Sequence, residues 1–196
     1  MASLDDRIYS LDLSGYESDK CLYDQLNRYK FIRNLCLNNS KLSNIPHQLN
    51  NMIALESLQL RQNGLKNLRH PLIHLENLKE LNLQKNQLHS KSMLECFTNL
   101  YSLLILDLSY NNIDQIPECI CEIKQLRVLN LSHNRLKSIS VNTCTSLTML
   151  HWFDISSNMI ESLPVQIQRL TNLKWFNISN NPMSRYNLRY TFFFDF

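Results

Sequence analysis

The stretch LRVLNLSHNRL, at residues 126–136, decides the fold. Leucine occupies its positions 1, 4, 6 and 11, and asparagine occupies position 9. Positions 4 and 6 are two residues apart, so Leu129 and Leu131 share one face of a short strand. A segment this short cannot bury that face alone, so it predicts neighbouring segments of the same kind.

The same pattern, L-x-x-L-x-L-x-x-N-x-L, recurs along the chain. Clear copies are LESLQLRQNGL (55–65), LKELNLQKNQL (78–88), LLILDLSYNNI (103–113), LHWFDISSNMI (150–160) and LKWFNISNNPM (173–183). Weaker copies are IYSLDLSGYES (8–18) and IRNLCLNNSKL (32–42). The pattern resembles that of leucine-rich repeat proteins. It predicts an α/β solenoid of about eight repeats, 23 to 25 residues each, with a parallel sheet on the concave side.

The repeats divide the chain into three regions. We expect a degenerate N-terminal repeat or cap at 1–31 and the main repeat domain at 32–188. An apolar tail that ends in FFFDF follows at 189–196. Because a repeat stack needs a polar cap, this tail either folds back as a lid or is foreign sequence after a truncation.

An asparagine ladder is predicted from position 9. Its amide can satisfy backbone donors and acceptors where the chain leaves each strand. The members are Asn63, Asn86, Asn111, Asn134, Asn158 and Asn181. Ser40 and Tyr16 replace asparagine near the N-terminus, where we expect looser geometry.

The outer half of each repeat predicts short return segments on the convex side. NIPHQL (44–49), QIPECI (115–120) and SLPVQI (162–167) each contain a proline that can open a helical turn. The repeat from Leu78 is longer, lacks this proline, and predicts a bulged convex segment.

Composition excludes several classes of function. Only two glycines occur, without a phosphate-binding motif, and the basic residues behind the net charge of +3 are scattered, so we expect no nucleic-acid partner. No apolar run is long enough for a membrane span, and the first residues do not resemble a secretory signal. We therefore expect the six cysteines to remain reduced.

The residues between the core leucines face outward from the predicted sheet. At position 3 they change from polar to apolar, so we expect Ile105, Val128, Trp152 and Trp175 to form one continuous strip. An apolar strip with a polar rim is typical of a partner-binding surface, here for an amphipathic helix or coiled coil. The residues assigned to this surface are Ile105, Asp107, Tyr110, Val128, Asn130, His133, Trp152, Asp154, Trp175 and Asn177. The alternative is that the tryptophans lie flat and only stabilise the stack.

No catalytic, metal or cofactor site is expected. His70 and His74 are separated by Pro71 and have no evident third ligand. Cys119 and Cys121 lack a second pair, and we expect them to divide between core and surface. The carboxylates of Asp107 and Asp154 lie on an open sheet, not in a closed cleft.

A further resemblance rests on SLDLSG (10–15), LDLSYN (106–111), LNLSHN (129–134) and the proline-free repeat after NQLHSKS (86–92). Over residues 8–183 these features resemble the N-terminal repeats of the flightless-I family of the gelsolin superfamily. That resemblance implies a scaffold that binds protein partners, including coiled coils, and is associated with the actin cytoskeleton and nuclear coregulation. Gelsolin-like domains are absent from this sequence, so direct actin binding is not expected.

The leading hypothesis is therefore a non-catalytic scaffold in the cytoplasm, associated with the cytoskeleton and also with the nucleus. The alternative is a regulatory subunit or effector that binds a small GTPase or a protein phosphatase. An extracellular receptor ectodomain is less favoured, because cysteine-rich caps are missing.

Overall fold

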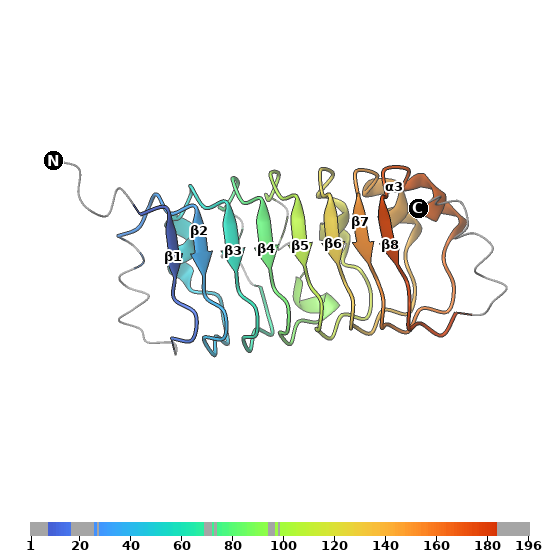
Figure 1. Cartoon of the computed structure of the whole chain (residues 1–196), viewed down its shortest axis with the longest axis horizontal. Helices are drawn as coiled ribbons and strands as arrows, with labels where there is room; N and C mark the ends of the chain where they lie inside the picture. The colour runs from blue at the N-terminus through green and yellow to red at the C-terminus, as the bar shows by residue number, and fades with distance from the viewer. Residues whose placement is uncertain are drawn as a thin grey trace.

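The computed structural model describes residues 8–16, 26, 28–68, 72, 74–93, 97 and 99–183. Each repeat contributes one three-residue strand, and the eight strands lie side by side in chain order (Figure 1). They are β1 (Ser10–Asp12), β2 (Asn34–Cys36), β3 (Ser57–Gln59), β4 (Glu80–Asn82), β5 (Ile105–Asp107), β6 (Val128–Asn130), β7 (Trp152–Asp154) and β8 (Trp175–Asn177). The predicted parallel solenoid is confirmed.

Every pair of neighbouring strands is parallel and aligned position by position. Leu106 pairs with Leu129, which pairs with Phe153, so position 4 of each repeat faces position 4 of the next. Even the degenerate first repeat follows this rule, since Leu11 pairs with Leu35. Equivalent positions therefore form columns that cross the strands.

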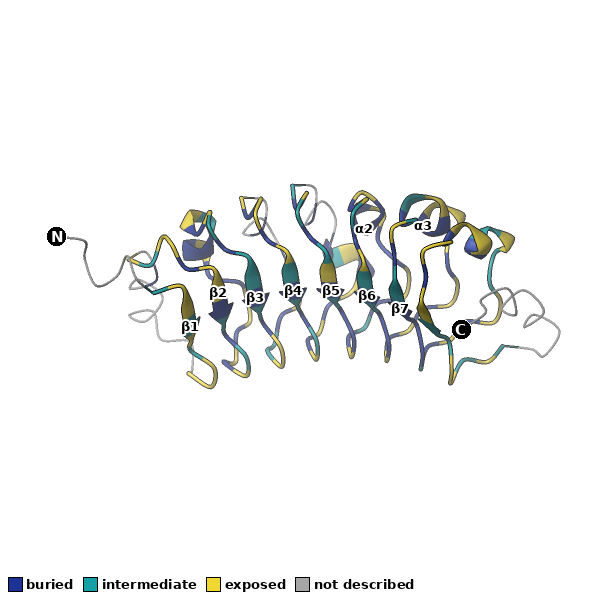
Figure 2. Ribbon diagram, turned by 45° about the horizontal axis from the view of Figure 1, so that its top comes forward, coloured by how far each residue is buried: buried dark blue, intermediate teal, exposed yellow. Residues whose placement is uncertain are grey.

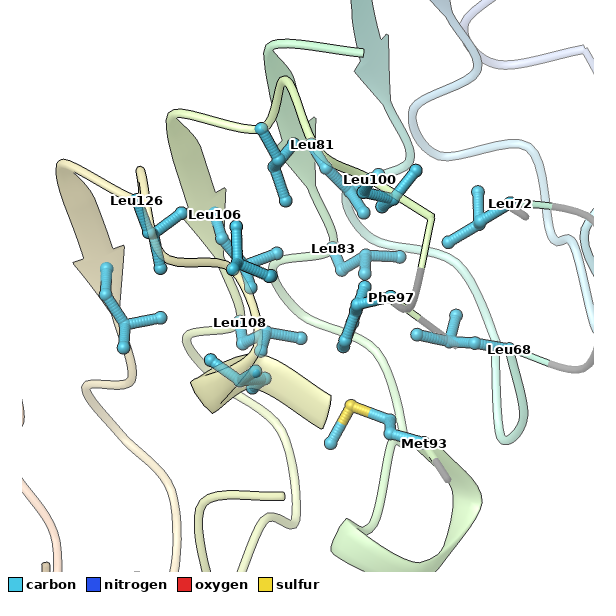
Figure 3. Close-up of a cluster of buried hydrophobic side chains, with 14 of the residues drawn as sticks. Leu68, Leu72, Leu81, Leu83, Met93, Phe97, Leu100, Leu106, Leu108 and Leu126 are labelled. Carbon is cyan, nitrogen blue, oxygen red and sulfur yellow. The ribbon is translucent and has the colours of Figure 1, made fainter. Parts of the chain in front are cut away.

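Positions 1, 4 and 6 build the core. Leucines 81, 83, 106 and 108 are fully buried. In Figure 3 these leucines, which lie in or directly after strands β4 and β5, point toward Phe97, Met93 and Leu100 from the return segments. Figure 2 is coloured by this division, since each of the strands β2 to β6 has a buried middle residue between intermediate or exposed ones. The exposed side formed by positions 3, 5 and 8 of the repeats, with position 2 at its edge, is called the sheet face below.

The return segments are short and mostly helical. They include η2 (His47–Asn51), η3 (Ser90–Met93), α2 (Glu118–Cys121), α3 (Val141–Ser146) and η4 (Val165–Arg169). The prolines behave as predicted, since Pro46, Pro117 and Pro164 immediately precede η2, α2 and η4. Ser140 caps α3 by accepting a hydrogen bond from the amide of Thr143 at 3.1 Å.

The expected split of Cys119 and Cys121 between core and surface is wrong, because both lie in helix α2 and both are buried. The pattern of alternate burial belongs to strands and not to a helical turn. The expected bulge after Leu88 begins with η3, but residues 94–96 and 98 lie outside the described residues, as does the tail 189–196.

The asparagine ladder is present in all six repeats that were predicted to carry it. The amide nitrogen of Asn134 donates to the carbonyls of Leu108 and Leu131, at 2.9 and 3.1 Å, and its oxygen accepts from the Ile113 amide at 3.0 Å. The other members make the same kind of bonds: Asn63, Asn86, Asn111, Asn158 and Asn181. These bonds bind each repeat to the one before it.

Ser40 partly substitutes for the missing asparagine. Its hydroxyl is buried and lies 3.2 Å from the carbonyl oxygens of both Leu13 and Asn38. The residues on either side of it, Asn39 and Lys41, both have a positive φ of 53°. The bonds to Leu13 and Asn38 keep the turn closed, while Tyr16 at the equivalent position of the first repeat is exposed.

Candidate functional site

The apolar strip consists of Ile105, Val128, Trp152 and Trp175, from strands β5 to β8. The strand register places these four residues in one column. Ile105 is 38% exposed and Trp175 is 39% exposed, while the two residues between them are half-buried. The indole rings of Trp152 and Trp175 stack with centroids 4.4 Å apart and planes 3° from parallel. Each ring thus covers one face of the other while the pair stays partly open to solvent.

A second column runs along position 8, at the turn that follows each strand. The rings of Tyr110 and His133 stack with centroids 4.0 Å apart, and the Lys85 ammonium lies 5.5 Å from the Tyr110 ring centroid. All three residues are exposed and have φ between 54° and 56°. A left-handed backbone is uncommon for such side chains. Here it projects them from the turn, where a cation, a phenol and an imidazole follow one another.

Position 5 has mainly a structural task. Asp107 accepts hydrogen bonds from the backbone amide and the hydroxyl of Ser109, at 2.8 and 2.7 Å. It also accepts one from the side-chain amide of Asn130 at 3.2 Å. Asp154 is buried and accepts from the Ser156 amide at 2.8 Å. Such local bonds fix the turn after each strand.

Asn130 and Asn177 repeat this arrangement, since their oxygens accept from the amides of Ser132 and Ser179. The assignment of Asp107, Asn130, Asp154 and Asn177 to a partner surface stays a prediction. Their carboxylates and amides already hold partners within the protein.

The N-terminal half of the sheet face satisfies its own polar groups. Glu80 accepts from Gln59 at 2.9 Å and from Ser57 at 3.3 Å. At position 2, Glu56 pairs with Lys79 at 2.7 Å and with Arg33 at 3.6 Å. These contacts lower the pKa of Glu56, chiefly through the hydrogen bond from Lys79.

The C-terminal half differs in its charges as well as in its strip. Position 2 there holds Arg127, His151 and Lys174, which immediately precede strands β6, β7 and β8. Arg127 and Lys174 are exposed, and neither forms an ion pair within the described part of the chain. His151 is half-buried, and its Nδ1 lies 2.8 Å from the carbonyl oxygen of Met149.

Sequence reasoning missed this basic border because it considered only positions 3, 5 and 8. The signal was available, since the column at position 2 reads Arg127, His151, Lys174 in consecutive repeats. Lys85 lies outside the predicted surface, although its position 8 places it beside Tyr110.

Metal and thiol chemistry find little support in the residues that are described. Within those ranges, no three His, Cys, Asp or Glu side chains are grouped so that they could hold a metal ion, and His70 lies outside them. Burial raises the pKa of the Cys144 thiol to about 12 and also raises that of Cys121. A thiolate is the reactive form of cysteine, so these groups are poor nucleophiles.

None of the helices in the described ranges has the length and apolar character needed to cross a lipid bilayer.

The stacked strands, the asparagine ladder and the open sheet face define a solenoid repeat protein that displays columns of side chains. Family models described as leucine rich repeat match residues 77–100, 94–136 and 124–183. The chain is a leucine-rich repeat protein. No curated protein matches the sequence.

Solved structures share the fold. A leucine-rich repeat protein of Leptospira interrogans matches with a TM-score of 0.77 and 26% identity, over 88% of this chain and 49% of that one. A second match is the ectodomain of the plant membrane receptor kinase GASSHO1/SCHENGEN3 from Arabidopsis thaliana, in complex with Casparian strip integrity factor 2. Its TM-score is 0.72 at 23% identity, and the match covers 91% of this chain and 25% of that one. An internalin from Listeria monocytogenes matches with a TM-score of 0.65 and 22% identity, over 95% of this chain and 58% of that one. The chain thus spans less than two thirds of each of these structures.

Proposed function

We propose that this protein is a non-catalytic binding module that holds a protein partner on the C-terminal half of its sheet face. Leucine-rich repeat domains generally mediate protein–protein interactions. The observation that carries the proposal is the apolar strip, which is exposed at both ends and contains a stacked tryptophan pair. Exposed apolar surface with a polar rim marks interaction sites, and tryptophan and tyrosine dominate their binding energy.

The contrast between the two halves of the sheet face supports this location. In the N-terminal half, Glu80 and Glu56 are each bonded to neighbouring side chains. In the C-terminal half, the apolar strip stays partly open to solvent, and Arg127 and Lys174 lack such partners within the described residues. A partner would satisfy them.

We further propose a cytoplasmic protein. Cys36, Cys119, Cys121 and Cys144 are free thiols, which suits a reducing compartment. The flightless-like link to the actin cytoskeleton rests on the sequence resemblance alone, and it predicts cytoskeletal or coiled-coil partners. The alternative, a regulator of a small GTPase or phosphatase, uses the same surface and differs in the partner found there.

Site-specific photo-crosslinking tests the location. The crosslinking amino acid p-benzoylphenylalanine would replace Val128 on the strip or, as a matched control, Val165 in η4, which is 55% exposed on the return side. In cells that express the protein, we expect adducts from position 128 and few from position 165. Mass spectrometry of the adducts separates a cytoskeletal or coiled-coil partner from a GTPase or phosphatase.

The double variant Trp152→Ala/Trp175→Ala separates binding from stability. We expect adducts at position 128 to fall at least about tenfold, since aromatic anchors carry much of an interface. The thermal midpoint should change little. Unfolding of the double variant would identify the strip as a covering layer, and adducts mainly from position 165 would move the surface to the return side.

A further inference from the structure

Two parallel rows of side chains on the sheet face indicate what shape of partner would fit there. The apolar strip crosses strands β5 to β8, and the basic border at position 2 runs beside it, one residue earlier in each repeat. Both rows run across the strands because the register is unbroken. A bound segment that follows them must therefore lie across the strands.

Side-by-side rows select a helix over an extended segment. In an extended strand successive side chains point to opposite faces, so a single segment can place only one row on the surface beneath it. In an α-helix a row at i, i+4, i+7 and a second row at i+1, i+8 lie next to each other on one side. A helix can therefore lay an apolar row on the strip and a charged row on the border.

The accessible charge on this half of the face is positive. Arg127 and Lys174 are exposed and without acidic partners among the described residues. The carboxylates of Asp107 and Asp154 are held by serine and asparagine donors on the other side of the strip, and Asp154 is buried. A complementary partner is therefore acidic along the border.

We propose that the occupant of this surface is an acidic amphipathic helix of a partner protein. Neighbouring strands lie about 4.8 Å apart, so the strip is about 15 Å long, which matches about ten helical residues at 1.5 Å each. Arg127 and Lys174 are two strands apart, about 10 Å, which matches carboxylates at i and i+7. The apolar row contacts Ile105, Val128 and the tryptophan pair.

This inference rests on the proposed function, and its test uses a different readout from the crosslinking experiment. A display library of helical peptides, with every outward position randomised, is selected against the full 196-residue chain. We expect enrichment of apolar residues along one row and of Asp or Glu seven residues apart in the adjacent row. Enrichment of basic residues, or of sequences without helical periodicity, would overturn the proposal.

Charge reversal then tests the contacts themselves. Binding of the selected peptides to Arg127→Glu/Lys174→Glu should weaken by at least about tenfold in low salt, mainly through slower association. Peptides with lysine at the two acidic positions should recover binding to this variant. The control Lys137→Glu/Arg169→Glu changes the net charge equally at exposed positions outside the sheet and should bind as the unaltered chain does.

Equal binding to both variants, or failure of the lysine peptides to recover it, refutes the acidic helix. So does a selection that yields no binder. If crosslinking at position 128 still captures a partner in those cases, the binding surface stands and only the class of its occupant is wrong. If crosslinking also fails, the proposed function falls with it.

Discussion

Replacement of Asn134 by alanine isolates the contribution of one rung of the asparagine ladder. The side chain makes three donor contacts, to the carbonyls of Leu108, Leu131 and Ser132, and accepts one bond, from the Ile113 amide. The asparagine is buried, so water does not replace these contacts freely. The cost of the change depends on which groups lose every partner.

The three carbonyls all keep a donor after the substitution. Leu108 still accepts from Asn111 at 3.0 Å, Leu131 from Asn158 at 2.9 Å, and Ser132 from the Tyr110 amide at 3.0 Å. The Ile113 amide, in contrast, loses its acceptor. One orphaned buried donor costs about 1–3 kcal/mol, and the weakened carbonyl contacts add a few tenths each. We expect the free energy of unfolding to fall by about 2–3 kcal/mol.

Equilibrium urea unfolding, followed by circular dichroism, measures this change, provided that the denaturant slope stays constant. Asn112→Ala is the matched control, because Asn112 is the next residue after a rung and its side chain lies outside the ladder. It should cost less than about 0.5 kcal/mol. Equal losses for Asn134→Ala and Asn112→Ala would refute the reasoning, as would an Asn134→Ala protein as stable as the unaltered chain.

Three further predictions concern the turn, the thiols and the tryptophan pair. Gln62 has φ of 56° and is exposed, so Gln62→Gly should raise the free energy of unfolding by about 0.5–1 kcal/mol, while Gln62→Val should lower it; urea titration checks both signs. Because burial raises the pKa of Cys144 to about 12, its thiol stays protonated at pH 8, and peptide mass spectrometry should find iodoacetamide on Cys36 first and on Cys144 only after unfolding. Equal labelling rates would contradict this order. The stacked indoles should give an exciton couplet in the circular dichroism spectrum, which either Trp152→Phe or Trp175→Phe should abolish; a couplet that survives would contradict the stack.

The columns of the sheet face could be predicted from two regularities: side chains alternate between core and surface along a strand, and equivalent positions of neighbouring repeats lie side by side. With Leu150, Phe153 and Ile155 in the core, alternation turns Trp152 outward, and the next repeat places Trp175 beside it. The same reasoning located the ladder, since the asparagine side chain supplies both a donor and an acceptor at the turn.

Other features of the site could not be read from the sequence. Position 8 is left-handed in every repeat, but it holds residues such as Gln62, Lys85 and Tyr110, none of which signals a positive φ. The task of Asp107 as a turn partner also stayed hidden, because an exposed carboxylate and a locally bonded one look alike in a sequence. Both depend on the closed turn that the whole repeat imposes.

Successive rungs share carbonyls, so every repeat joins the next through the same bonds and the repeats stack at a constant spacing. The Leu108 carbonyl accepts from Asn111 in its own repeat and from Asn134 in the next. When a whole unit is gained by duplication or lost by deletion, the flanking rungs can still join in the same way. Each such event between them would move the tryptophan pair relative to the first strand by one strand spacing, about 4.8 Å. Changes in the number of units thereby alter the spacing of recognition groups without redesigning any single unit.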